Sequence, residues 1–207
     1  MSAFAEMKVD GHSDRKRLMP IGLRRFGCVA LLCFVVLSTA GKAAAQGQSA
    51  ADGLLAKGMA LKGAGELGGA AAFAEAITLN PKQANAHNLL GAACEKLGRP
   101  SQAIREFDAA RQLEPSSREF AYNLALAYYQ AGFFSRAIAT IQEAPSSAPK
   151  TAEFYRLLGD AEVGADQYVK GVRDLRKSVA LDPSESAGFY DLGIAILKSA
   201  SDRDALA

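Results

Sequence analysis

Apolar residues recur at steps of three and four along most of the chain after residue 50. The segment AHNLLGAACEKLG, which ends at Gly98, places Leu89, Leu90, Ala93, Cys94 and Leu97 on one face of a helix. After the break at Arg99-Pro100, the segment SQAIREFDAARQLEP has a similar stripe, formed by Ala103, Ile104, Phe107 and Ala110. The pattern therefore predicts two amphipathic helices that are joined by a short turn near Gly98.

A proline recurs at a fixed interval behind these helices. Pro81, Pro115, Pro149 and Pro183 are each 34 residues apart, and they close the similar phrases AFAEAITLNP, REFDAARQLEP, ATIQEAPSSAP and DLRKSVALDP. A fixed period of this size predicts an array of helical repeats, in which a unit buries its apolar face only against its neighbours. Proline stops the second helix of a unit, and Ser116 with Glu119 suits a capping box for the helix that follows.

The positions within this period resemble the tetratricopeptide repeat. In that family the first helix carries a leucine, a small residue, a packing residue and a turn residue, and the second carries a small, a bulky and a small residue. The copy before Pro115 has these as Leu90, Gly91, Cys94, Gly98, Ala103, Phe107 and Ala110. The next copy has Leu124, Ala125, Tyr128, Gly132, Ala137, Ile141 and Ala144. The copy after it has Leu158, Gly159, Gly171, Leu175 and Ser178, and it departs from the pattern at Glu162 and Asp166.

The resemblance implies an all-α fold, a right-handed α-solenoid of stacked helix-turn-helix repeats over residues 46–207. We place the repeats at about 50–83, 84–117, 118–151 and 152–185, with a partial repeat at 186–207. In the looser first unit, Gly58, Leu61 and Gly65 take the small, bulky and turn positions. Pro145 is expected to shorten the second helix of the third unit. The helix of the partial repeat is apolar on several sides, through Phe189, Ile194, Ile196 and Leu197.

The first 45 residues have the features of an export signal. Basic residues from Arg15 to Arg25 precede the apolar run FGCVALLCFVVLSTA, residues 26–40. Ser38-Thr39-Ala40 and Ala43-Ala44-Ala45 both suit a signal-peptidase site. A run of 15 residues is shorter than the roughly 20 that span a membrane. We therefore interpret residues 1–45 as a signal peptide. Two alternatives stay open: an uncleaved signal anchor formed by residues 26–40, and a translation start at Met19.

Charge and cysteine content change once this leader is set aside. It holds seven of the 24 basic and three of the 22 acidic residues, so the remainder has a net charge of −2. We therefore expect no nucleic-acid partner. Cys28 and Cys33 belong to the leader, and Cys94 alone cannot form an internal disulfide. Cys94 falls at a packing position and is interpreted as a buried thiol.

One motif suggests a different class of protein. GAGELG, residues 63–68, fits G-x-G-x-x-G, which cradles dinucleotide phosphates when it follows a strand and opens a helix. The preceding GLLAKGMALK is helical in character, so we interpret the glycines as a loose turn between two helices. His87 is the only histidine after the leader, which excludes a multi-histidine metal site. We expect no enzyme activity and no cofactor.

The resemblance also implies a concave groove lined by the first helix of each unit. In that register the groove residues are Asn88, Tyr122, Asn123, Leu126, Tyr129, Arg156, Asp160 and Tyr190, joined by Ala92, Glu95, Val163, Ile194 and Leu197. Exposed tyrosine and leucine at such positions favour a surface for a peptide or a partner helix. The alternative is that the apolar ones pack on neighbouring helices. Asn123 matches a carboxylate clamp known in the family, but Leu55 and Met59 replace its lysine and asparagine, and Asp160 would repel a carboxylate.

These features predict an exported, non-catalytic scaffold, periplasmic or secreted, that binds a protein or peptide in its groove. Two further functions stay open: a docking segment of a larger, truncated enzyme, and an envelope assembly factor tethered to the membrane by its leader. A helix that is apolar on several sides also favours self-association at the C-terminal end.

Overall fold

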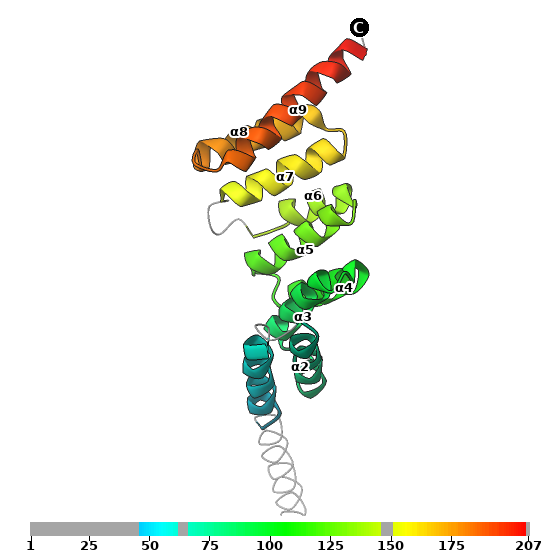
Figure 1. Ribbon diagram of the computed structural model, residues 1–207, viewed down its shortest axis with the longest axis vertical. Helices are drawn as coiled ribbons and strands as arrows, with labels where there is room; N and C mark the ends of the chain where they lie inside the picture. The colour runs from blue at the N-terminus through cyan, green and yellow to red at the C-terminus, as the bar shows by residue number, and fades with distance from the viewer. Residues whose placement is uncertain (1–45, 62–65, 146–150, 206–207) are drawn as a thin grey trace, which may run out of the picture. The chain divides into compact units, whose positions relative to one another are not determined.

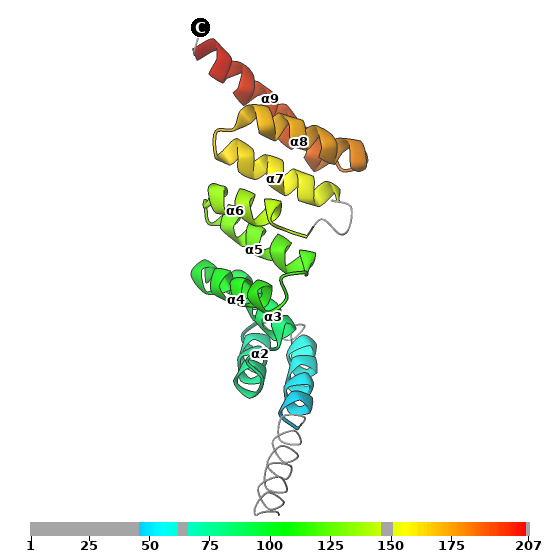
Figure 2. The same ribbon diagram turned by 180° about the vertical axis from the view of Figure 1, so that it is seen from behind.

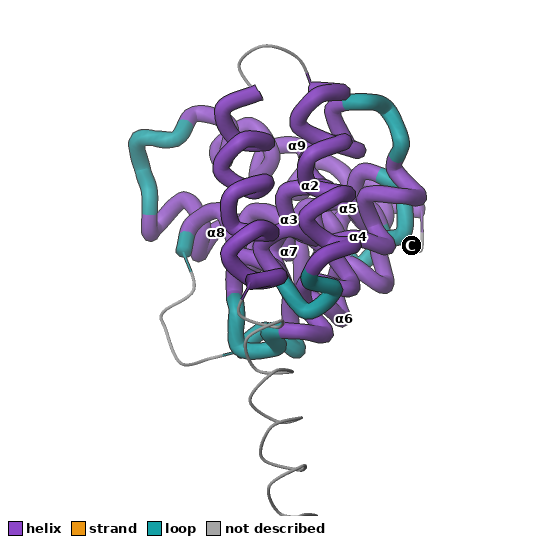
Figure 3. Tube along the Cα trace, turned by 90° about the horizontal axis from the view of Figure 1, so that it is seen from below, coloured by secondary structure: helices purple, strands orange, loops and turns teal. Residues whose placement is uncertain are grey.

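The computed structural model describes residues 46–61, 66–145 and 151–205, so the predicted leader lies outside the described part. Within these ranges the chain forms helices and turns, without a strand (Figure 3). A helix over residues 46–61 is followed by α2 (Glu66–Leu79), α3 (Ala84–Lys96), α4 (Pro100–Leu113), α5 (Arg118–Gln130), α6 (Phe134–Gln142), α7 (Ala152–Gly164), α8 (Tyr168–Leu181) and α9 (Ser186–Ala205). No helix in the described ranges is both long and apolar enough to cross a membrane.

The helices stack in chain order. Each helix from α2 to α9 packs on the next, and the first helices of neighbouring units also contact one another: α3 with α5, α5 with α7, and α7 with α9. Figures 1 and 2 show the resulting succession of helix pairs from both sides. The predicted all-α solenoid of helical repeats is confirmed.

Small residues lie where the two helices of a unit cross, as the 34-residue period predicts. A Cβ atom on Gly91 would lie 2.7 Å from the ring of Phe107, and one on Gly159 would lie 2.6 Å from Cγ of Leu175. Such a distance is too short for two carbon atoms, so only glycine fits. Gly58 has the same relation to Phe73 in the first unit. Bulky side chains of the second helices thereby become fully buried against the first helices.

The turns within the units share one backbone geometry. Gly98 and Gly132 have φ values of 68° and 77°, and Asp166, at the same place in the period, has 60°. In each case the residue after the turn donates its N–H to a carbonyl five residues back, as from Gln167 to Glu162 at 2.8 Å. This is the Schellman closure of a helix, which favours glycine. Asp166 departs from the repeat pattern in sequence but keeps its backbone conformation.

Two expectations about helix ends can be checked. α6 ends at Gln142 and has nine residues, against 14 in α4, which agrees with Pro145 shortening it. The predicted capping box at Ser116 and Glu119 is wrong by one residue. Ser117 is the N-cap of α5, and its hydroxyl accepts from the N–H of Phe120.

The GAGELG segment follows the helix over residues 46–61, and its last three residues belong to α2. No strand is described before it, in agreement with a connection between helices. The predicted turn is nevertheless too long, because α2 begins at Glu66 and contains Gly68 and Gly69. Gly63 and Gly65, including the predicted turn position, lie outside the described residues.

Candidate functional site

The first helices α3, α5, α7 and α9 present the residues that the sequence assigns to a groove. We call these side chains the first-helix face: Asn88 on α3; Tyr122, Asn123, Leu126 and Tyr129 on α5; Arg156 and Asp160 on α7; and Tyr190 on α9. Because adjacent first helices contact one another, the face spans several units. Its residues differ widely in exposure, from the buried Asn88 to Tyr190, which is 70% exposed.

Asn88 is not an exposed groove residue, so that expectation is wrong. Its side chain is buried, and its amide donates to Oε1 of Glu119 at 3.2 Å. Its Oδ1 accepts from Nδ2 of Asn123 at 2.8 Å. A buried amide is retained only when it is hydrogen-bonded. Asn88 and Asn123 therefore tie α3 to α5.

The three apolar groove candidates on α5 are half-buried. Tyr122, Leu126 and Tyr129 pack against the buried cluster formed by α5, α6 and α7. The ring of Tyr122 lies 5.4 Å from that of Phe154, and together they line a pocket of about 330 Å³ at the start of α5 and α7. Leu126 thus contributes mainly to packing, whereas both tyrosines also line pockets.

A second pocket, the central pocket, has a volume of about 370 Å³ and draws on three successive first helices. It unites Tyr129 of α5, Asp160 of α7 and Tyr190 of α9. Its remaining lining residues are Phe134, Val163, Gly164, Asp191, Ile194 and Lys198. Sequence reasoning placed Val163 and Ile194 on this surface, but it missed Lys198, which lies one helical turn beyond Ile194 and could have been found by extending the stripe.

Charged groups of α7, of α9 and of the turn before α9 lie near the two acidic lining residues of the central pocket, Asp160 and Asp191. Arg156 forms ion pairs with Glu185 at 3.3 Å and with Asp191 at 3.7 Å. Burial, followed by the charge of Asp191, raises the pKa of Asp160 to about 7, and Arg156 acts in the opposite direction. Near neutral pH, Asp160 is therefore divided between a neutral carboxyl that can donate a hydrogen bond and a carboxylate.

This pKa predicts a pH dependence of stability. In the folded state Asp160 keeps a proton that it releases in the unfolded state near its ordinary pKa of 3.8. The contribution of this proton to the free energy of unfolding is therefore complete below pH 3.8 and is lost as pH rises toward 7. We expect Asp160→Asn to be more stable than the wild type at pH 8. The difference in free energy of unfolding between the variant and the wild type should favour the variant by on the order of 1–3 kcal/mol more at pH 8 than at pH 4. Urea unfolding at both pH values measures this change. An equal difference at the two pH values would contradict it.

A buried carboxylate pair joins α7 to α8, at a position where the sequence departs from the repeat pattern. Glu162 and Asp174 are each 1% exposed. Burial and the neighbouring Asp174 raise the pKa of Glu162. Burial also acts to raise the pKa of Asp174, but hydrogen bonds from Arg173 and Lys177, at 2.7 Å each, outweigh it and lower that pKa. Glu162 of α7 and Asp174 of α8 therefore meet inside the contact between these two helices.

His87 and Cys94, the histidine and the cysteine among the described residues, do not line the central pocket. Cys94 is buried, as expected, and burial raises the pKa of its thiol. His87 contacts Glu106 and the carbonyl of Pro81, at 2.8 and 3.1 Å. Among the residues with described side chains, no group of three or more histidine, cysteine, aspartate or glutamate residues could hold a metal ion.

Known structures share this architecture. MamA from Desulfovibrio magneticus RS-1 is similar with a TM-score of 0.68 and 22% identity, over 75% of this chain and 89% of that one. Pseudomonas aeruginosa PilF is similar with a TM-score of 0.64 and 16% identity, over 75% and 72%. YrrB, described as a TPR protein with an unusual peptide-binding site, has a TM-score of 0.55 and 19% identity, over 66% and 71%. At these identities the likeness concerns the fold.

Family comparison identifies the repeat directly. No curated protein sequence matches the chain. Two family models, both described as tetratricopeptide repeat, match residues 55–118 and 96–161, and together they span just over half of the sequence. The matched segments contain the close contacts of the Phe73 and Phe107 rings with Gly58 and Gly91. They also contain the left-handed turns at Gly98 and Gly132. This chain is a tetratricopeptide-repeat protein.

Proposed function

We propose that the chain is a non-catalytic scaffold that binds a segment of another protein at the central pocket of the first-helix face. The observation that carries this proposal is the pocket itself, since Tyr129, Asp160 and Tyr190 from three successive units line it together. Its apolar walls suit one large apolar side chain of a partner, and the polar groups at its edge can orient the partner's backbone. Tyrosine at the centre of an interface is a common source of binding energy.

The similarity to YrrB supports a peptide ligand, because YrrB is described as a TPR protein with an unusual peptide-binding site. The pocket volume of about 370 Å³ lies near the lower end of the range typical of ligand sites. A single anchoring side chain is therefore the expected mode of recognition, with the surrounding residues excluding water. Val163 and Ile194 supply the apolar walls, while Lys198 lies at the α9 side.

Site-specific photo-crosslinking in the native cell tests this function. We expect a benzophenone amino acid at the exposed position Tyr190 of the full chain to give one discrete adduct, which mass spectrometry identifies. The control carries the same label at Gln112, an exposed position on α4, and should give none. Adding Ile194→Asp to the Tyr190-labelled chain should reduce the adduct at least fivefold, because it places a charge in the pocket. Equal adducts at Tyr190 and Gln112, or no adduct at Tyr190, would overturn the proposal.

Export to the periplasm or the exterior is the second part of the proposal, and it rests on the sequence pattern of residues 1–45. Mass spectrometry of the chain purified from its native source should find a mature N-terminus after Ala40 or Ala45. An intact N-terminus with membrane association would favour the signal anchor. A chain that is intact and recovered outside the membrane fraction would contradict export by this signal.

A further inference from the structure

α9 carries a second apolar surface, on a different side from the central pocket. We call it the open α9 face: Phe189, Gly193, Ile196 and Ala200, which follow one another at helical spacing. Phe189 is 51% exposed and Ile196 is 43% exposed. A Cβ atom on Gly193 would have no neighbour within 4 Å. No other described helix therefore covers the position of Gly193.

The 34-residue period shows how the same face is used in the preceding unit. On α7 the corresponding residues are Tyr155, Gly159 and Glu162, and α8 covers all three. Nζ of Lys177 lies 5.1 Å from the ring centre of Tyr155, and Leu175 occupies the space above Gly159. Glu162 meets Asp174. In this unit the face is therefore the seat of the second helix.

The same seat recurs on α3, two units further back. Its corresponding residues are His87, Gly91 and Cys94, and α4 covers them. Glu106 contacts Nδ1 of His87 at 2.8 Å, and the ring of Phe107 lies above Gly91. On the open α9 face, Gly193 stands at the position in the period that Gly91 and Gly159 occupy in the earlier units. This face therefore has the shape that receives an antiparallel helix with a bulky apolar side chain.

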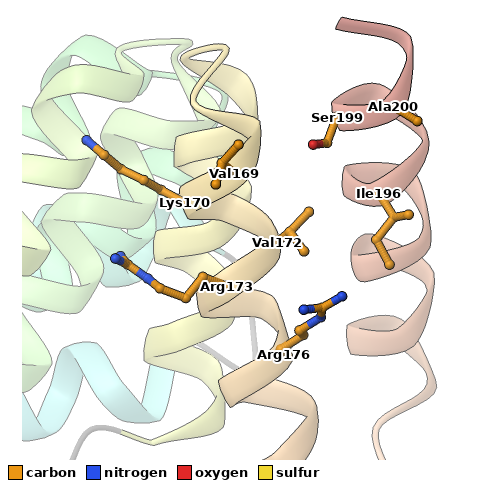
Figure 4. Close-up of a pocket in the computed structure, with 8 residues that line it drawn as sticks. All are labelled: Val169, Lys170, Val172, Arg173, Arg176, Ile196, Ser199 and Ala200. Atoms are coloured by element: carbon orange, nitrogen blue, oxygen red, sulfur yellow. The ribbon is translucent and has the colours of Figure 1, made fainter. Parts of the chain in front are cut away.

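The charged residues beside the open α9 face indicate what kind of helix could bind there. A pocket of about 540 Å³ lies between α8 and α9, and its lining has no acidic residue. It includes Lys170, Arg176 and Arg173, of which Arg173 is paired with Asp174. Figure 4 shows Val172 and Arg176 pointing from α8 toward α9, and Ser199 pointing back. Ile196 and Ala200 of the open α9 face line the same pocket. A helix seated here would meet apolar side chains along its centre and positive charge at its edge.

We infer that the open α9 face binds an amphipathic helix of another protein, which places a bulky apolar side chain over Gly193 and acidic side chains toward Arg176. The helix takes the position that α8 has on α7. This surface is separate from the central pocket, because Tyr190, Ile194 and Lys198 of α9 line that pocket and the open α9 face does not. One chain can thus bind two protein segments at once.

A peptide of defined sequence tests the inference. The probe is the α4 sequence, Pro100–Leu113, with Arg105→Glu and Arg111→Glu, a lactam staple to hold it helical, and a fluorophore. It keeps the phenylalanine that seats on Gly91 and gains the acidic charge that Arg176 requires. Fluorescence anisotropy with the full-length chain measures its affinity. We expect the probe to bind, and the same probe with Phe107→Ala to bind at least tenfold more weakly.

Matched variants of the chain locate the binding site. Gly193→Leu fills the seat and should lower the affinity at least tenfold, while Gly53→Leu, which also enters open space in a helix, should leave it unchanged. Arg176→Glu should lower the affinity at least threefold and weaken its salt dependence. Circular dichroism should show unchanged helicity, because a Cβ atom at either glycine meets no neighbour.

Three results would overturn the inference. The first is that the probe does not bind, and the second is equal affinity for the wild type and Gly193→Leu. The third comes from sedimentation of the chain alone. If the wild type is a dimer and Gly193→Leu is a monomer, a second copy occupies the face and not another protein's helix.

Discussion

Replacing Phe107 with alanine is expected to lower the free energy of unfolding by about 3–5 kcal/mol. The side chain is 1% exposed and lies against Gly91, in the buried cluster that links the first three units. Removing the ring loses its burial and leaves a cavity that the neighbours cannot close, since Gly91 has no side chain to move into it. Because each unit is stabilised by its neighbours, the loss should weaken the units on both sides.

Leu113→Ala provides the control for this prediction. Leu113 lies on the same helix, α4, but is 37% exposed, so its truncation should cost clearly less, about 1 kcal/mol or below. Urea unfolding followed by circular dichroism measures both variants. Similar losses of unfolding free energy for Phe107→Ala and Leu113→Ala would contradict the placement of Phe107 in the buried contact between α3 and α4.

The second large effect is a difference between two glycines that stand 34 residues apart. Gly159→Ala should destabilise the protein by about 1–3 kcal/mol, because the new Cβ would lie 2.6 Å from Cγ of Leu175 and 3.1 Å from the backbone oxygen of Gly171. Gly193→Ala should instead stabilise it by about 0.5–1 kcal/mol, since the new methyl group enters open space and alanine favours the helix.

The two substitutions are matched in chemistry and in repeat position, so intrinsic helix propensity cancels in the comparison. The remaining difference measures whether a helix covers the residue. Thermal and urea unfolding of both variants should therefore give shifts of opposite sign. Shifts of the same sign and size would show that Gly193 is covered as Gly159 is, and that the open α9 face does not exist.

The sequence was sufficient to predict the fold because the repeat repeats its packing chemistry. The same small and bulky positions recur every 34 residues, so that Gly91 with Phe107 and Gly159 with Leu175 form one contact twice. The left-handed turns follow the same rule. Asp166 is not a glycine, yet its place in the period corresponds to Gly98 and Gly132, and its backbone agrees with theirs.

The candidate site was predicted less completely, because its contacts join different units. Asn88 has the helical register of a groove residue, but it is buried by Glu119 and Asn123, which lie 31 and 35 residues further along the chain. Burial first, and then the charge of Asp191 on α9, similarly raises the pKa of Asp160. A periodic pattern identifies the face of a helix on which a residue lies, but the neighbouring unit decides whether that face is covered.

The same limit applies to the tyrosines of α5. Register alone left open whether they are exposed or pack on neighbouring helices, and the structure shows Tyr122 and Tyr129 half-buried against the cluster that includes Phe154. Replacing them would therefore disturb packing as well as binding. Tyr190 and Ile194 of α9 are better probes of the central pocket, since both are exposed at its edge.

The most direct test of the groove function is fluorine NMR of the full-length chain labelled with 3-fluorotyrosine, titrated with the partner that crosslinks at Tyr190. The six tyrosines include internal controls. Tyr129 and Tyr190 line the central pocket, whereas Tyr168 lies at the start of α8, outside it. Binding at the central pocket predicts that the Tyr129 and Tyr190 resonances shift together at saturation while that of Tyr168 is unchanged. A partner that shifts Tyr168 and leaves Tyr129 and Tyr190 unchanged would contradict the proposed site.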